Sequence, residues 1–182
     1  MTGSRNRERM IRMEVNEAIR TKRAIRKFTT EGVSSEEIEK ILNAGRLAQS
    51  AKNSQPWHFI VMDDRRILKE LSKLGHFAGH ISGATFAVAI ITPPPEQRFS
   101  IMFDAGQAAA YMQLAAWEIG IGSCLATIYQ TDPARDLLGF PDDLEIRIAI
   151  SFGYPAEKFD LTRKLVKGGR RKFEEVVHWN TW

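Results

Sequence analysis

The 182-residue sequence has very little cysteine and no long hydrophobic run. Its one cysteine, Cys124, excludes an intrachain disulfide and a zinc site built from cysteines, and is typical of a reducing compartment. The longest apolar run, Phe86 to Ile91, is far too short to cross a bilayer, and the first twenty residues lack the apolar segment of a signal peptide. These absences predict a cytoplasmic protein with no membrane segment.

The composition is that of an ordinary globular protein, with 43% hydrophobic and 26% charged residues. The length predicts one domain with a sizeable core, and no repeat or low-complexity linker divides it. We expect residues 1–9 to form a flexible basic extension and residues 10–182 to form the single domain.

The net charge of +4 is distributed unevenly along the chain. Residues 1–27 and 158–172 each carry a net charge of +6, whereas residues 28–157 carry −6. The two basic segments either bind an anionic partner or are simply solvated. A polyanion such as a nucleic acid is one candidate partner, and a small phosphorylated molecule is another.

The hydrophobic pattern predicts a mixture of helices and strands. A capping box of Ser34 and Glu37 begins one helix, and an alanine-rich segment forms the strongest helix, which Gly120 and Gly122 end. The expected helices are 10–19, 34–47, 65–74, 100–119 and 132–139, and the expected strands are 57–62, 85–92 and 145–152. This order predicts an α+β or α/β fold with helices packed on a sheet.

Several standard catalytic and metal-binding motifs are missing. No GxGxxG or P-loop is present, which disfavours a Rossmann site and an ATPase. His76 and His80 have the spacing of metal ligands on a helix, but neighbouring glycines argue against a firm helix there. We therefore interpret the pair as loop or core residues, predict no metal site, and interpret Cys124 as a packing residue rather than a nucleophile.

Two short segments have the residue types of a binding site. Residues 22–28 (KRAIRKF) place four cations in six residues, and the interleaved apolar side chains would hold them against the core. Such a cluster suits a phosphate, although a solvated helix end is the alternative. Residues 50–57 (SAKNSQPW) form a polar loop before a strand. Its Asn and Gln amides can read the edge of a heterocycle, although a capped turn is the alternative.

These segments resemble motifs of the nitroreductase family of FMN-dependent oxidoreductases. Residues 23–28 (RAIRKF) are similar to the family's R-S-x-R-x-F, and residues 50–59 (SAKNSQPWHF) are similar to S-x-x-N-x-Q-P-W-x-F. The alanine-rich helix running into 120–124 (GIGSC) is similar to the family's central dimer helix and the flavin-edge loop after it. Residues 153–155 and 170–178 are similar to its closing segments. The resemblance covers residues 13–182 in the family's order.

The resemblance implies an α+β sheet flanked by helices, in an intertwined homodimer with FMN sites built from both chains. It assigns the FMN phosphate to the basic residues and the flavin and ribityl region to the polar loop and the residues after the glycine-rich turn. The implied cofactor-binding residues are Lys22, Arg23, Ala24, Arg26, Ser50, Asn53, Gln55, Pro56, Leu125, Ala126, Thr127 and Arg170 or Arg171. NADH or NADPH would be the reductant, and no side chain is implied as a catalytic acid or base.

Three positions depart from the family's motifs. Ala24 replaces a serine and so lacks a hydroxyl for the phosphate, and Lys22 replaces an arginine and so lacks bidentate geometry. Gln49 stands where the family often has proline. The cluster of cations is kept, so we expect FMN to be kept.

The implied activity is hydride transfer from NAD(P)H to a small oxidised acceptor, such as a nitroaromatic or a quinone, by a ping-pong mechanism. A flavoenzyme of the same superfamily with different chemistry (a dehydrogenase, a dehalogenase or a flavin-fragmenting enzyme) is the first alternative. A basic nucleic-acid-binding module is a weaker alternative, because the basic segments carry no interleaved stacking aromatics or recognition motif.

Overall fold

The structure is a computed structural model that describes residues 13–157 and 169–182. The predicted 1–9 extension and most of the basic segment 158–172 lie outside these residues, so the division at residue 10 stays a prediction. The helices are α1 (Val15–Thr21), α2 (Ser35–Arg46), α3 (Arg65–Leu71), α4 (Ser100–Glu118) and α5 (Thr131–Leu138). The strands are β1 (His58–Met62), β2 (Phe86–Thr92), β3 (Gly122–Thr127) and β4 (Glu145–Gly153). Short 3-10 turns are η1 (Ala51–Asn53), η2 (Ala78–Gly83), η3 (Pro95–Gln97) and η5 (Phe173–Glu175).

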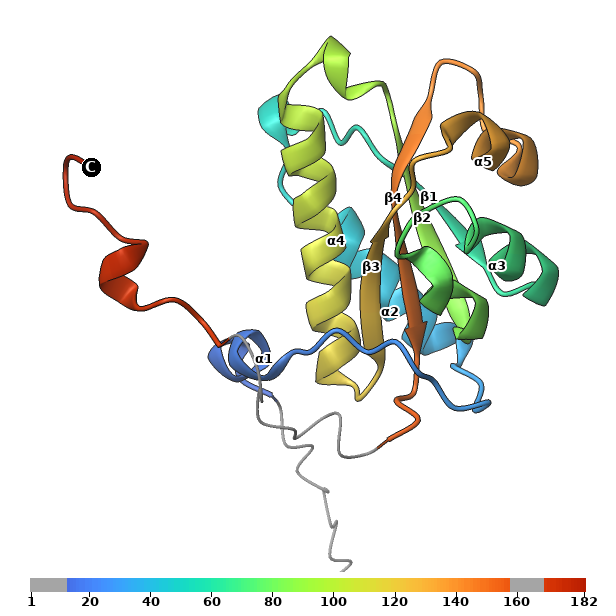
Figure 1. The fold of residues 1–182 in the computed structure, drawn as a ribbon, viewed down its shortest axis with the longest axis horizontal. Coiled ribbons are helices and arrows are strands. Elements are labelled where there is room, and N and C mark those ends of the chain that lie inside the picture. Colours follow the sequence, from blue (N-terminus) through green and yellow to red (C-terminus); the bar gives the residue numbers. More distant parts are fainter. Residues whose placement is uncertain (1–12, 158–168) are drawn as a thin grey trace, which may run out of the picture.

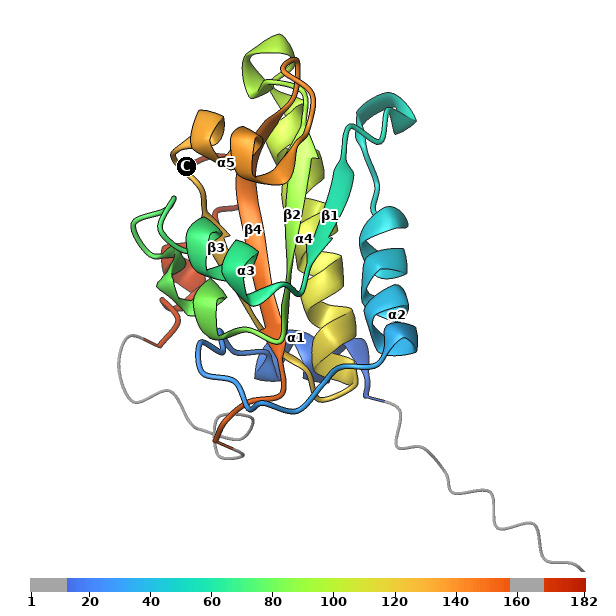
Figure 2. The ribbon, with the colours of Figure 1, turned by 90° about the vertical axis from the view of Figure 1, so that its right-hand side faces the viewer.

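The four strands form one antiparallel sheet in the order β1-β2-β4-β3. The central strand β2 is buried along its whole length, as its continuous apolar sequence predicts. Helices α2 and α4 cover one face of the sheet, and α3 and α5 cover the other (Figures 1 and 2). The predicted α+β class is therefore confirmed.

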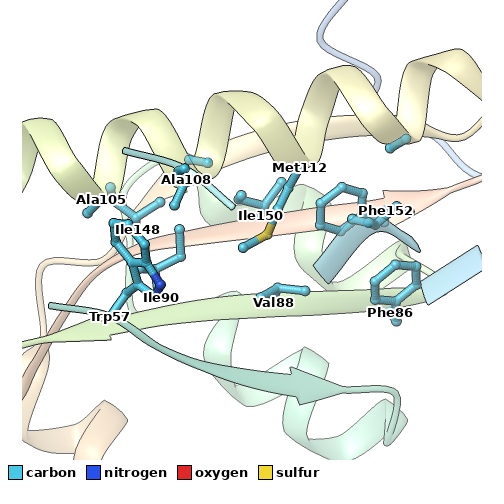
Figure 3. Close-up of a cluster of buried hydrophobic side chains, with 14 of the residues drawn as sticks. Trp57, Phe86, Val88, Ile90, Ala105, Ala108, Met112, Ile148, Ile150 and Phe152 are labelled. Carbon is cyan, nitrogen blue, oxygen red and sulfur yellow. The ribbon is translucent and has the colours of Figure 1, made fainter. Parts of the chain in front are cut away.

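The larger core lies between the sheet and the pair α2 and α4. Alternate residues of β2 and β4 meet Ala105, Ala108 and Met112 of α4, as Figure 3 shows. The small alanine side chains of α4 let this helix lie close to the sheet. A Cβ added to Gly45 of α2 would overlap the Met112 side chain, so α2 also packs close to α4.

The structure corrects the expected secondary structure at several places. Residues 122–127, expected as a glycine-rich turn and a loop, form the edge strand β3. Helix α1 runs from Val15 to Thr21, so it ends two residues beyond the expected end at 19; residues 10–12 of the expected helix lie outside the described residues. Helix α3 ends at Leu71 rather than 74, and α5 begins at Thr131 rather than after Asp132. The capping box is confirmed, since Ser34 Oγ accepts from Glu37 N and Glu37 Oε2 accepts from Ser34 N.

Candidate functional site

The basic segment 22–26 follows α1 directly, and Arg23 closes the end of that helix. Arg23 Nη1 donates to the carbonyl oxygens of Arg20, Thr21 and Lys22 at 3.0, 2.8 and 3.1 Å. These contacts satisfy carbonyls that the last turn of a helix leaves free. Arg23 therefore has a structural role here, in addition to any role in binding.

Ile25 fixes the basic segment against the start of β3. Its side chain is only 2% exposed, and its N–H donates to Ser123 O at 3.0 Å. Ala24 pairs with Ser123 in a parallel bridge. A Cβ on Gly122 would lie 2.7 Å from Ile25 Cβ, so the close approach depends on glycine at this position. With Ile25 inward, Ala24 and Arg26 are exposed beside the strand.

The cations of this segment have no acidic partner among the residues that the structure describes. No ion pair there involves Lys22, Arg23 or Arg26. Burial lowers the pKa of Lys22, negative charge on Cys124 would raise it, and the nearby Arg26 charge lowers it further. Positive charge gathered without a counter-ion, partly desolvated beside a strand edge, suits a small anion.

Cys124, His76 and His80 are packed against other residues of the chain rather than arranged as reactive groups. Burial raises the pKa of Cys124, against the effects of Arg26 and Lys22, which favours the thiol over a nucleophilic thiolate. His80 Nδ1 lies 2.8 Å from Ser151 Oγ, and burial followed by the Arg26 charge lowers the pKa of His80. His76 packs edge-on against Tyr129, with ring centroids 4.8 Å apart. Within residues 13–157 and 169–182, no group of three or more His, Cys, Asp or Glu residues could hold a metal ion.

The polar loop 50–56 has a constrained backbone. Lys52, Asn53 and Gln55 have φ angles of 55°, 53° and 45°, in the left-handed region that non-glycine residues rarely adopt. Ser50 Oγ accepts from Gln55 N at 2.9 Å, and the Ser50 carbonyl oxygen accepts from Asn53 N at 3.0 Å. These bonds hold the amide side chains of Asn53 and Gln55 on the surface.

Asp104 of α4 supports this loop from beneath, and it is not among the residues predicted from the sequence. It is 3% exposed, and its Oδ1 accepts from Ala51 N at 3.1 Å. Arg98 Nη2 lies 3.5 Å from Asp104 Oδ2 and donates to Ser54 Oγ at 2.5 Å. Asp104 is the only acidic residue of α4 before the last residue of the helix, Glu118, and this was the available signal, because a buried carboxylate requires partners.

The two groups of predicted binding residues lie at opposite ends of α4 within one chain. Asp104, below the loop, and Trp117, which donates to Thr21 Oγ1 at 2.9 Å, are thirteen residues apart on that helix. At 1.5 Å per residue the separation is about 20 Å. In Figure 1, η1 lies beside the upper end of α4 and α1 lies beside the lower end. The basic segment is therefore brought together with β3 but not with the loop.

The remaining predicted residues differ in exposure. On β3, Leu125 and Thr127 are exposed, whereas Ala126 is 3% exposed and offers only its backbone. Arg170 and Arg171 are exposed in a C-terminal segment that runs away from the body (Figure 1). Gln55 borders a cleft of about 810 Å³ between α2 and β1, and Leu42, Trp57 and Phe59 supply its apolar lining.

Comparison with known proteins gives consistent matches. The profile of the nitroreductase family matches residues 19–82 and 75–154. A protein of Archaeoglobus fulgidus with the provisional name NADH dehydrogenase/NAD(P)H nitroreductase is 36% identical over 149 residues, which cover 78% of this chain and 86% of that protein. A protein of Methanothermobacter thermautotrophicus with the same provisional name is 30% identical over 178 residues, covering 94% and 89% of the two chains. The solved structure of an FMN-dependent nitroreductase from Clostridium difficile matches with a TM-score of 0.80 and 31% identity, covering 91% of this chain and 98% of that one.

The chain belongs to the nitroreductase family. The predicted resemblance is confirmed, and with it the expectation of an oxidoreductase of this family. In the part of the chain that the structure describes, no helix is both long and apolar enough to cross a membrane.

Proposed function

We propose that this protein binds FMN and passes hydride from NADH or NADPH to a small oxidised acceptor, such as a nitroaromatic or a quinone, in a ping-pong reaction. The observation that carries the proposal is the cluster of Lys22 and Arg26, which has no acidic partner among the described residues and lies beside the edge strand β3. The family membership and the FMN-dependent relative of similar fold support it.

The residues present fit FMN. The cations of the basic segment, with Arg170 or Arg171, would hold the phosphate, and the exposed Ala24 leaves room there although it lacks a hydroxyl. The buried Ser123 Oγ beside them has no hydrogen-bond partner. Leu125, Ala126 and Thr127 would border the flavin, and the polar loop residues Ser50, Asn53, Gln55 and Pro56 would contact the ring and the ribityl chain.

The reaction requires little chemistry from side chains. Bound FMN would supply a centre that accepts a hydride and later releases it. The chain's residues would bind and orient the cofactor, and exposed donors and cations would stabilise negative charge that develops on it. We propose no catalytic acid or base: the Cys124 thiol is buried, and His80 is engaged with Ser151.

We further propose an intertwined homodimer in which the polar loop of one chain completes the basic cluster of its twin. The separation of the two groups along α4 supports this arrangement. Exposed apolar side chains support it too, because a monomer would leave them in water. They are Met102, Phe103 and Tyr111 on α4 and Phe173, Val176, Trp179 and Trp182 in the C-terminal segment. No nucleic acid or membrane partner is proposed, and a cytoplasmic location stays a prediction.

An FMN titration with Arg26→Ala and the matched control Lys27→Ala tests the phosphate site. Arg26 and Lys27 are neighbouring exposed cations, and only Arg26 is among the implied phosphate ligands. A charge-assisted hydrogen bond contributes about 1.5–3 kcal/mol, so we expect Arg26→Ala to raise the FMN Kd about tenfold or more. Lys27→Ala should leave the Kd within about twofold. Equal effects of both substitutions would show that only general charge attracts FMN and would refute the assignment of Arg26.

A further inference from the structure

We infer that Asp104, acting through Arg98 and Ala51, is a positioning residue that holds the polar loop in its binding conformation. This inference rests on the proposed function, since the loop is the proposed flavin contact. Asp104 itself touches no reacting group; it lies beneath the loop, on the second turn of α4.

The burial of Asp104 requires an explanation. Among the residues that the structure describes, Asp104 is the only charged residue that is buried. Moving a carboxylate out of water is costly, and a nearby cation and an N–H donor offset only part of that cost. An apolar residue would extend the alanine-rich surface of α4 at no such cost. A role in fixing a particular backbone conformation accounts for an acid at this place.

The conformation that Asp104 supports is a costly one. Three non-glycine residues of the loop, Lys52, Asn53 and Gln55, have positive φ angles. Each such residue costs conformational free energy and persists only when surrounding contacts determine it. The hydrogen bonds that Ser50 accepts within the loop help to hold these φ angles, but they do not attach the loop to the rest of the domain.

Asp104 and Arg98 supply that attachment at both ends of η1. Asp104 Oδ1 binds the first residue of the turn through Ala51 N, and Arg98 Nη2 binds the residue after it through Ser54 Oγ. Arg98 Nη2 also lies 3.5 Å from Asp104 Oδ2, so each side chain orients the other. Without this pair, FMN binding would have to order the loop at a cost in affinity.

The test compares Asp104→Ala and Arg98→Ala with wild type. The FMN Kd is measured by flavin fluorescence quenching, and amide hydrogen exchange of residues 50–56 is measured without FMN. We expect each substitution to raise the Kd about tenfold and to speed exchange across 50–56 by a similar factor. Because the two side chains act together, the double variant Asp104→Ala/Arg98→Ala should have an FMN Kd at most about twofold above that of the weaker-binding single variant. Independent side chains would instead give the product of the two single effects.

Two control variants separate this role from others. Glu118→Ala, at the far end of α4, removes a carboxylate that pairs with Lys40 at 2.9 Å and should change neither readout. Asp104→Asn keeps an oxygen for Ala51 N and should restore part of the slow exchange, and it replaces Asp104→Ala if the latter does not fold. Unchanged exchange and a Kd within twofold of wild type would overturn the inference. If wild type binds no FMN, the proposed function fails, and exchange alone then decides the role of Asp104.

Discussion

Gly122→Ala should displace the basic segment from β3. A Cβ at position 122 would lie 2.7 Å from Ile25 Cβ, 2.7 Å from Cγ1 and 2.8 Å from Cγ2. Ile25 is 2% exposed and packs with Ala18 and Trp117, so it cannot turn away into solvent. The strand or the segment must therefore shift, and the shift moves Lys22 and Arg26 together with Ile25.

Two effects of this substitution oppose each other. Overpacking a buried contact costs about 1–3 kcal/mol. Replacing glycine lowers the entropy of the unfolded chain, which stabilises by about 0.4–1 kcal/mol. The overpacking is the larger effect, and we expect a net loss of about 1–2 kcal/mol. For a chain of this size that loss corresponds to a fall in Tm of about 2–8 °C.

Thermal unfolding and the FMN titration together test this reasoning. Gly32→Ala is the matched control, because a Cβ there would meet no atom within 4 Å. We expect the control to keep the wild-type Tm or exceed it slightly, and Gly122→Ala to lower both the Tm and the affinity for FMN. A Gly122→Ala protein with the Tm and Kd of the control would refute the claim that this contact positions the cations.

Three further predictions concern the elements around the site. Ser34→Ala should lower the free energy of unfolding by about 1 kcal/mol in denaturant titration, because it removes the capping hydrogen bond of α2. Thr21→Val should lower it by about 1–3 kcal/mol, because the part-buried Trp117 indole N–H loses its acceptor. Hydrogen bonds from Ser34 N and Tyr154 lower the pKa of Glu37, so their stabilising effect is present above its usual pKa and is lost as the pH falls. The stability difference between wild type and Glu37→Gln should therefore be largest at neutral pH and shrink below about pH 4.5.

The elements with strong local patterns could be predicted from the sequence. The apolar run of β2, the alanine-rich α4 and the capping box of α2 each carry a signal that does not depend on distant residues. The two segments proposed to bind FMN stood out by their residue types, but each also fitted a plain structural alternative, and only the family resemblance assigned them to FMN; their role stays a prediction.

The rest depends on long-range pairing. Strand β3 (GSCLAT) has little strand propensity of its own and forms because β4 supplies its hydrogen-bond partners, with Leu125 opposite Ile150 and Ala126 opposite Ala149. The bond between Asp104 and Ala51 spans 53 positions, so no local pattern could indicate it. The left-handed backbone of Lys52 follows from those contacts rather than from its own preference.

Anaerobic reduction of the purified protein shows whether it is an FMN-dependent oxidoreductase. We expect a yellow protein, carrying its own FMN or binding added FMN, whose flavin absorbance bleaches on addition of NADH or NADPH. Adding a nitroaromatic or a quinone after the nicotinamide is consumed should restore the absorbance, as a ping-pong reaction requires. A colourless protein that fails to bind added FMN, or a bound flavin that neither nicotinamide reduces, would contradict the proposed function.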